Sequence, residues 1–171
     1  MKLTGFESAA IHPAAARELR FAVEEFNAEY CAVLDSGEIE QWPGFFTDDA
    51  IYRITARENA DAGMLVGLVY AEGKGMLQDR AVSIARTQMF APRYNLHVTG
   101  NVRVLRQLDN GEFCAQSTFM LLQTLVDGQT TLHLAGRYYD RFVQDGDRLL
   151  LRERQAVYDT TMIATDLVYP V

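Results

Sequence analysis

The sequence predicts an α+β fold in which N-terminal helices pack on one face of a strongly curved antiparallel sheet. The N-terminal third has helical periodicity, and the C-terminal half consists of β-rich runs. The turn signals Asp109-Asn110-Gly111, Asp127-Gly128 and Asp145-Gly146 separate these runs, and Asp-Gly pairs favour tight hairpins. Helices followed by consecutive strands are typical of α+β domains. A sheet curved around the helices would form a cone with an interior.

Length, composition and charge indicate a single globular domain. The chain has 171 residues, of which 49% are hydrophobic and 23% charged, so we expect one domain over residues 1–171 with residues 1–12 as a flexible extension. The net charge of -7 argues against nucleic-acid partners, because phosphate neutralisation requires basic patches. We also expect a cytoplasmic protein without a membrane partner, since the sequence has no spanning apolar run and no signal-peptide pattern.

Two helices are predicted in the first third of the chain. From Pro13 to about Leu34, apolar residues recur at spacings of three and four, as in an amphipathic helix. Pro13 opens this helix and Ser36-Gly37 closes it. A shorter helix from Glu38 to Phe45 follows, in which Pro43 disfavours a long regular helix.

The middle of the chain is less regular. Alternation predicts a strand over Ala50–Ala56, and Arg57–Gly63 has the composition of a loop. Met64–Ala71 fits either a strand or a buried helix, because periodicity does not separate the two. A third helix is predicted over Met76–Thr87, and Phe90–Leu96 is irregular. The meander strands are expected over residues 97–108, 112–126, 130–143 and 148–158. They exceed the usual length of about six residues, so twisting and bulging are expected.

The aromatic segment Ile39–Ile54 allows a structural and a functional interpretation. Trp42, Phe45 and Phe46 share a helical face and are expected to build the core, because clustered rings bury large areas. Asp48 and Asp49 would then hold a turn after the helix. In the functional alternative, Asp49 and Tyr52 form a pocket pair.

His97 has two possible roles. It begins a predicted strand in which alternate residues point to opposite faces. One face carries Val98, Val102, Val104 and Leu108, and the other carries His97, Asn101 and Arg103. With Tyr30 and Asp35 it could form an acid–base site inside the cone. Alternatively, it is hydrogen-bonded at a subunit contact or at the pocket rim.

A polar and aromatic face is predicted on the strand that contains His133. Alternation places His133 opposite Leu132, Leu134, Tyr138 and Phe142, on the side of Arg137, Tyr139 and Arg141. Such a face is either plain surface or a protein interface. Arg and Tyr are favoured at protein interfaces, so we interpret this face as an interface.

No cofactor or metal site is predicted in this chain. His12, His97 and His133 are widely separated, and no HExxH or Cys-His pair is present. Cys31 and Cys114 lie far apart in apolar contexts, which favours buried free thiols. Nucleophile and phosphate-loop motifs are also absent from the sequence.

Four segments occur in an order that resembles a known family. They are YCAVLDSGEIEQWPGFFTDDAIYRI, GMLQDR, PRYNLHVTGNVRV and GRYYDRF. Together they are similar to the small (β) subunit of bacterial aromatic-ring-hydroxylating dioxygenases, from about Phe21 to the C-terminus. Within that family the resemblance is greatest to enzymes acting on aromatic carboxylates such as terephthalate or salicylate.

The resemblance implies a nuclear-transport-factor-2-like cone and a structural function without catalysis by this chain. It implies that three β subunits form a trimer beneath three α subunits, and that the α subunits carry a Rieske [2Fe-2S] cluster and a mononuclear Fe(II). The family's Met-Leu-x-Asp-Arg motif falls on Met76, Leu77, Asp79 and Arg80, and we expect Asp79 and Arg80 to make paired contacts at a helix end or a subunit boundary. The candidate interface residues are Asp79, Arg80, Arg93, His97, His133, Arg137, Tyr139 and Arg141.

Two rival hypotheses remain on the same cone. One is an independent dehydratase or isomerase of the scytalone-dehydratase or ketosteroid-isomerase type, with Tyr30, Asp35, Tyr52 and His97 as acid–base groups. The other is a free-standing binding module with an apolar pocket.

Overall fold

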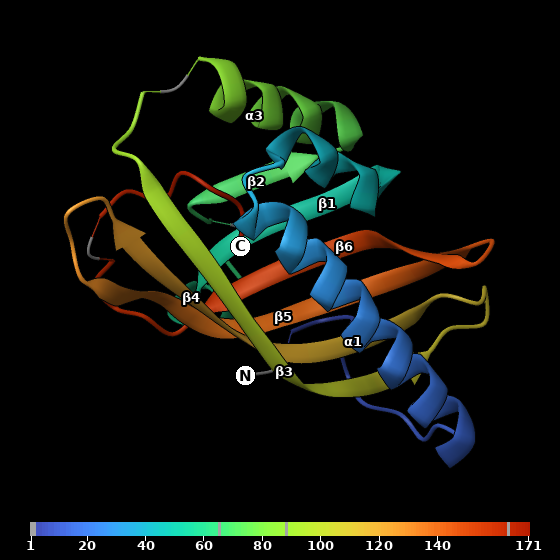
Figure 1. Cartoon of the computed structure of the whole chain (residues 1–171). Helices are drawn as coiled ribbons and strands as arrows, with labels where there is room; N and C mark the ends of the chain where they lie inside the picture. The colour runs from blue at the N-terminus through green and yellow to red at the C-terminus, as the bar shows by residue number, and fades with distance from the viewer. Residues whose placement is uncertain (1–2, 65, 88, 164) are drawn as a thin grey trace.

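Helices pack on one face of a six-stranded sheet in the computed structural model, which confirms the predicted α+β fold (Figure 1). The structure describes residues 3–64, 66–87, 89–163 and 165–171. The helices are α1 (Pro13–Asp35), the 3₁₀-helix η1 (Ile39–Phe45), α2 (Arg57–Asp61) and α3 (Lys74–Arg86). The strands are β1 (Phe46–Ala56), β2 (Val69–Glu72), β3 (Arg93–Gln107), β4 (Phe113–Leu125), β5 (Thr130–Asp145) and β6 (Arg148–Tyr158).

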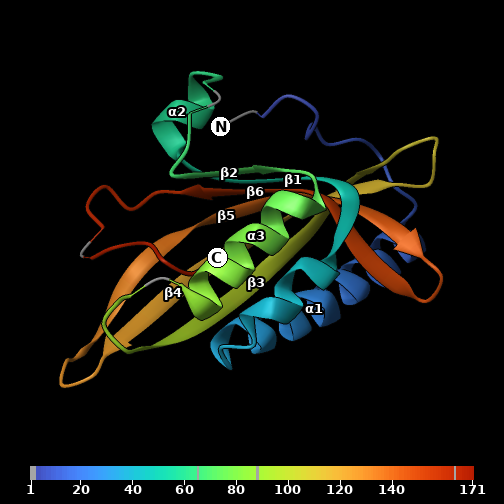
Figure 2. The same ribbon diagram turned by 90° about the horizontal axis from the view of Figure 1, so that it is seen from above.

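The strand order is β2-β1-β6-β5-β4-β3, and β3 to β6 form the predicted antiparallel meander. The sheet as a whole is mixed, because β1 pairs parallel with β6. The sheet curves around α1 and α3, as Figure 2 shows from above. On its other side lie α2 and the N-terminal segment (Figure 2).

Helix α1 forms as its periodicity predicts. Its buried residues recur at helical spacing and are Val23, Phe26, Asn27, Tyr30, Cys31 and Leu34. Pro13 occupies the first turn, and Nδ1 of His12 accepts a hydrogen bond from the Ala14 amide at 3.3 Å. The helix ends before Gly37, whose φ of 80° favours glycine. The buried stripe packs mainly against β3.

The aromatic corner is a core element, as predicted. Trp42 is fully buried, and its ring makes edge contacts with Phe46 at 5.3 Å and Tyr52 at 5.1 Å between centroids. The predicted short helix is a 3₁₀-helix. It contains Pro43, whose ring is incompatible with the interior of an α-helix.

The predicted turn at Asp48 and Asp49 was wrong. Both residues lie within β1, which begins at Phe46. The register with β6 shifts between Phe46 and Ile51, so the acidic pair occupies an irregular part of the strand. Asp49 accepts a hydrogen bond from the Thr47 hydroxyl at 2.9 Å. Phe46 and Ile51, on either side of this segment, pair with β6, and local sequence does not encode that pairing.

Three other boundaries differ from the prediction. Arg57–Asp61, expected as loop, is the short helix α2. The segment Met64–Ala71, which fitted either a strand or a helix, ends in strand β2, which covers Val69–Glu72. Leu65 lies outside the described residues. Strand β3 begins at Arg93, within the segment expected to be irregular. The third helix is confirmed as α3.

A bulge reverses the faces of β3. The register with β4 shifts between Gly100 and Arg103, and Asn101 adopts a φ of 51°, which is unusual for a residue other than glycine. His97 is buried and Val98 is 42% exposed, whereas Val102 beyond the bulge packs against the core. The single apolar face predicted for Val98 and Val102 was therefore wrong, because the bulge interrupts the alternation.

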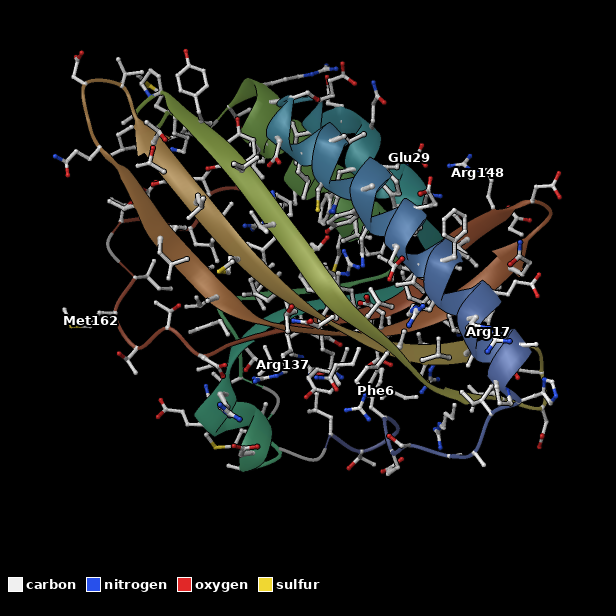
Figure 3. All side chains as sticks on the ribbon, turned by 60° about the horizontal axis from the view of Figure 1, so that its bottom comes forward. Phe6, Arg17, Glu29, Arg137, Arg148 and Met162 are labelled. Carbon is white, nitrogen blue, oxygen red and sulfur yellow. The ribbon has the colours of Figure 1, made fainter. Side chains whose placement is uncertain are left out.

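The N-terminal segment crosses the side of the sheet away from α1. Phe6 is buried and makes an edge contact with Tyr139 at 5.7 Å between ring centroids, and the Ala9 amide donates to the Leu105 carbonyl at 2.8 Å. Figure 3 shows Phe6 and Arg137 on this side of the sheet. The flexibility expected for residues 1–12 stays a prediction.

Candidate functional site

A charged pair lies at the centre of the cone. Arg154 on β6 and Asp140 on β5 are both completely buried and form two hydrogen bonds, Nε to Oδ1 at 2.9 Å and Nη2 to Oδ2 at 2.8 Å. Nη2 also donates to Oδ1 of Asn27 on α1 at 2.7 Å. Removing one partner of such a pair leaves an uncompensated buried charge. The pair, together with the hydrogen bond to Asn27, therefore links β5, β6 and α1.

The Arg154 guanidinium is also stacked between two tyrosine rings. Its carbon lies 4.3 Å from the ring centroid of Tyr30 and 4.1 Å from that of Tyr138. Burial opposes the charge on Arg154, but the Asp140 carboxylate and the two tyrosines outweigh burial and raise its pKa above the ordinary value. The cation is thus held by an acid and by two aromatic faces.

A second group joins three aromatic side chains to the end of the chain. Trp42 Nε1 donates to the Tyr30 hydroxyl at 2.8 Å, and this hydroxyl donates to the Val171 carbonyl at 3.1 Å. The Tyr52 hydroxyl donates to the same carbonyl at 3.0 Å and accepts from the Val171 amide at 2.9 Å. Burial raises the pKa of Tyr30 to about 12 and that of Tyr52 well above its ordinary value, so both hydroxyls stay protonated donors.

Residues 165–171, termed here the C-terminal strap, bring Val171 to this position. The strap is anchored by side chains from three elements. Thr165 Oγ1 donates to Oε1 of Gln123 on β4 at 2.9 Å, and Arg80 Nη2 on α3 donates to the Val168 carbonyl at 3.1 Å. Arg93 on β3 forms an ion pair with Asp166 at 3.2 Å. Figure 1 shows the C-terminal end inside the fold, and Val171 is completely buried.

The structure brings His97 and Asp35 together. Nδ1 of His97 lies 2.6 Å from Oδ1 of Asp35, and the His97 amide donates to Oδ2 at 2.9 Å. Asp35 is the last residue of α1, so the pair fastens this end of the helix to β3. Nε2 of His97 is buried and has no hydrogen-bond partner among the described residues.

The acid–base residues of the dehydratase hypothesis are divided into two separate groups. Within the described part of the chain, no hydrogen bond links the Tyr30 and Tyr52 hydroxyls, which hold Val171, to the Asp35–His97 pair. The proposed pocket pair of Asp49 and Tyr52 does not form. Asp49 is exposed and bound to Arg152 at 2.6 Å, whereas Tyr52 is completely buried.

His133 lies inside the protein and not on the predicted outer face. The register between β4 and β5 shifts at Leu121/Leu122, so the alternation that predicted an outward side chain is interrupted there. His133 is 1% exposed, and neither ring nitrogen has a partner among the described residues. Burial and then the Arg93 cation lower the pKa of His133, against an opposing effect of Asp166.

The other candidate interface residues differ in the ion pairs and hydrogen bonds that they make within this chain. Arg137 pairs with Asp159 at 3.0 Å, and Arg141 lies 3.8 Å from Glu153. Asp79 is exposed on α3 and, within the described chain, has no hydrogen bond or ion pair. Arg80 binds the strap through the Val168 carbonyl, whereas the contact expected of Asp79 at a helix end or a subunit boundary stays a prediction.

Sequence reasoning missed two features. One is the Arg154–Asp140 pair, although Asp140 alternates with Tyr138 and Phe142 and could have been assigned to the buried face. The other is a group of outward-facing apolar residues at one end of β3, β4 and β5. This outer apolar face consists of Tyr94, Leu96, Val98, Met120, Leu122 and Leu132, of which all but Leu122 are at least 42% exposed.

Among the described residues, no three His, Cys, Asp or Glu side chains are grouped so that they could hold a metal ion. None of the described helices combines the length and apolarity needed to span a membrane. A pocket of about 410 Å³ lies on the outer side of the sheet, beside Thr4, Arg53 and Met64, and none of the acid–base residues of the dehydratase hypothesis lines it.

Comparisons with known proteins agree with the resemblance read from the sequence. Residues 30–165 match the family described as "Ring hydroxylating beta subunit". The chain is 33% identical over 151 residues to the anthranilate 1,2-dioxygenase small subunit of Burkholderia cepacia, covering 88% of this chain and 93% of the relative. It is also 33% identical over 149 residues to a terephthalate 1,2-dioxygenase terminal oxygenase component subunit beta 2 of Comamonas sp., covering 87% and 96%.

Solved structures give the same result. The β subunit assigned to an aromatic-ring-hydroxylating dioxygenase of Novosphingobium aromaticivorans superimposes with a TM-score of 0.81 at 35% identity, covering 91% of this chain and 98% of that one. A protein of the same organism assigned as a scytalone dehydratase has a TM-score of 0.66 at 17% identity, covering 90% and 91%, and shares the fold alone. These matches confirm the nuclear-transport-factor-2-like cone. The chain belongs to the β-subunit family of aromatic-ring-hydroxylating dioxygenases.

Proposed function

We propose that this chain is a structural subunit which forms a trimer and supports three large subunits of an aromatic-ring-hydroxylating dioxygenase. The relatives are named as a small subunit and as a subunit of a terminal oxygenase component, and both names imply a larger partner. The described side chains form no group that could hold a metal ion. We therefore assign the Rieske [2Fe-2S] cluster and the mononuclear Fe(II) to the large subunit.

The outer apolar face is the observation that carries this proposal. Its residues form cross-strand pairs, Leu96 with Leu122 and Val98 with Met120. Contiguous exposed apolar surface marks interaction sites, and Tyr and Met are enriched at interfaces. The N-terminal segment covers another part of the same side of the sheet, where Phe6 packs on Tyr139. The apolar end without such a cover is therefore suited to a partner subunit.

The interior supports a structural role over independent catalysis. A dehydratase or isomerase would need free acid–base groups facing a substrate. Here Val171 engages both the Tyr30 and the Tyr52 hydroxyl, and Asp35 engages His97. The chemistry of the complex would then take place in the large subunit. The relatives' names favour an aromatic carboxylate as substrate. A cytoplasmic location stays a prediction.

Co-expression with the large subunit whose gene is most closely linked to this one tests the proposal. The tag is placed on this chain alone. We expect a brown complex with Rieske absorption and equal numbers of the two chains. Recovery of a colourless chain without a partner would contradict the proposal.

A matched pair of variants then tests the surface. Leu96→Asp places a charge in the outer apolar face, and we expect it to reduce recovery of the large subunit or of the trimer at least tenfold. Phe21→Asp places the same charge on α1, at a side chain that is 63% exposed and outside this face. We expect this control to retain the complex. Equal recovery from both variants would exclude the outer apolar face as the contact.

A further inference from the structure

The contacts of Val171 resemble those of a bound ligand more than those of a packed strand. Its carbonyl oxygen accepts from two tyrosine hydroxyls and its amide donates to one of them, so side chains satisfy both main-chain groups. Val171, Tyr30 and Tyr52 are all completely buried. Two hydroxyl donors converge on one main-chain oxygen of Val171, and together they can occupy two of its lone pairs.

The surroundings orient this site in advance. Trp42 Nε1 donates to the Tyr30 hydroxyl at 2.8 Å, which leaves the Tyr30 proton free to point at Val171. The Trp42 ring contacts the rings of Phe46 and Tyr52, so the tyrosine is held by aromatic packing. Preorganised donors lower the cost of ordering a bound group.

We propose that Tyr30 and Tyr52 form a carbonyl-binding site inside the cone, which the C-terminal strap occupies in cis and which takes a small branched acyl compound when the strap is displaced. The ligand class follows from Val171, which occupies the site. The ligand needs a carbonyl or carboxylate oxygen to accept from the two hydroxyls and an N–H group to donate to Tyr52. It also needs an apolar group of the size of a valine side chain. This inference goes beyond the structural function proposed above and does not depend on it.

The strap can be loosened without altering the site, because its anchors are separate from the two tyrosines. Asp166 is bound to Arg93, and the Tyr169 ring makes an edge contact with Phe90 at 5.6 Å between centroids. Neither Asp166 nor Tyr169 contacts the Tyr30 or Tyr52 hydroxyl through a hydrogen bond of the described residues. Changes at these anchors should therefore vacate the site and leave its donors in place.

The experiment uses the full chain with Asp166→Asn and Tyr169→Ala combined, and N-acetyl-L-valine as the probe. Hydrogen exchange at the Val171 amide, which donates to Tyr52, reports whether the strap opens, and we expect faster exchange than in the unaltered chain. Thermal melts with the probe at about ten times its Kd should show a rise in Tm of about 3 °C in the variant. The unaltered chain should show no rise, because the strap competes from within the same molecule.

Two controls make the result specific. N-acetyl-D-valine should leave the Tm unchanged, since its amide, oxygen and side chain cannot all reach the positions that Val171 occupies. Adding Tyr52→Phe to the variant should abolish the rise, because this hydroxyl contributes two of the three hydrogen bonds. If the double variant does not fold, Tyr169→Ala alone, which removes a ring contact and no charge, replaces it.

Several results would overturn the proposal. One is a strap that opens while neither enantiomer changes the Tm. Equal shifts with the two enantiomers, or a shift that survives Tyr52→Phe, would show that the probe binds elsewhere. A strap that stays as protected as in the unaltered chain would contradict the proposal that a strap held by Arg93 and Phe90 can be displaced from the site.

Discussion

Asp35 holds His97 through both its ring and its main chain. Oδ1 lies 2.6 Å from Nδ1 of His97, and Oδ2 accepts the His97 amide at 2.9 Å. The carboxylate of the last residue of α1 thereby binds β3 at His97, which lies before the bulge and faces inward. The two residues are 62 positions apart in the chain, so the contact depends on the correct packing of the helix on the sheet.

The first prediction concerns this pair. Asp35→Ala should lower the free energy of unfolding by about 2–3 kcal/mol, because two donors of His97 lose a charged acceptor. Urea denaturation measures the loss. Asp48→Ala is the matched control, since the Asp48 side chain is 99% exposed, and it should change stability by less than about 0.5 kcal/mol. Equal effects of the two substitutions would refute a structural role for the pair.

The second prediction concerns the aromatic corner. Trp42→Ala should cost about 3–5 kcal/mol, as large-to-small changes in a packed core do. Phe21→Ala removes a ring that is 63% exposed and should cost no more than about 0.5 kcal/mol. Guanidinium melts of both variants provide the comparison. A loss in Trp42→Ala within the error of the melts would mean that the cluster is not part of the core.

The third prediction compares two tyrosines that are equally buried. The Tyr52 hydroxyl makes two hydrogen bonds with Val171, so Tyr52→Phe should destabilise the protein by about 1–2 kcal/mol. The Tyr138 hydroxyl is buried without a partner among the described residues. Tyr138→Phe should therefore be neutral or stabilising, because it removes a desolvated polar group. Thermal melts of the two variants measure the change in stability. A larger loss of stability in Tyr138→Phe than in Tyr52→Phe would contradict the assignment of these hydrogen bonds.

The fourth prediction is a pH dependence that arises from His133. Burial and the Arg93 cation lower its pKa in the folded protein, whereas in the unfolded chain it titrates near its ordinary pKa of about 6.5. Below that pH the unfolded state binds more protons, so the free energy of unfolding falls as the pH falls from about 6.5 until His133 also protonates in the folded state.

His133→Gln should remove this part of the dependence. Denaturation curves recorded between about pH 5 and 7 should give a smaller slope of stability against pH in the variant than in the unaltered protein. Identical slopes would show that His133 is not held neutral by its surroundings.

Local sequence patterns predicted much of the fold because their causes are local. Helical spacing gave α1, and the Asp-Gly turn signals gave the meander. The aromatic spacing around Trp42 also placed the core corner correctly. Errors occurred where pairing between distant strands changed the outcome, as at Asp48 and Asp49, which lie between two residues of β1 that pair with β6.

The candidate site was less predictable from the sequence. His97 and Asp35 were named and do meet, but the two tyrosines named with them bind Val171 instead. The strap was not anticipated, since nothing local in residues 165–171 indicates that Arg80, Arg93 and Gln123 will hold it.

The sequence by itself determined most of the elements, the β-subunit family and the aromatic core. Only the tertiary structure decided which side chains face inward on β3 and β5, and what fills the cone. The physical reason is that one extra residue in a bulge interrupts the alternation of a strand, and its position is set by cross-strand register. Likewise, the buried Arg154 and Asp140 become partners only when two strands and a helix close around them.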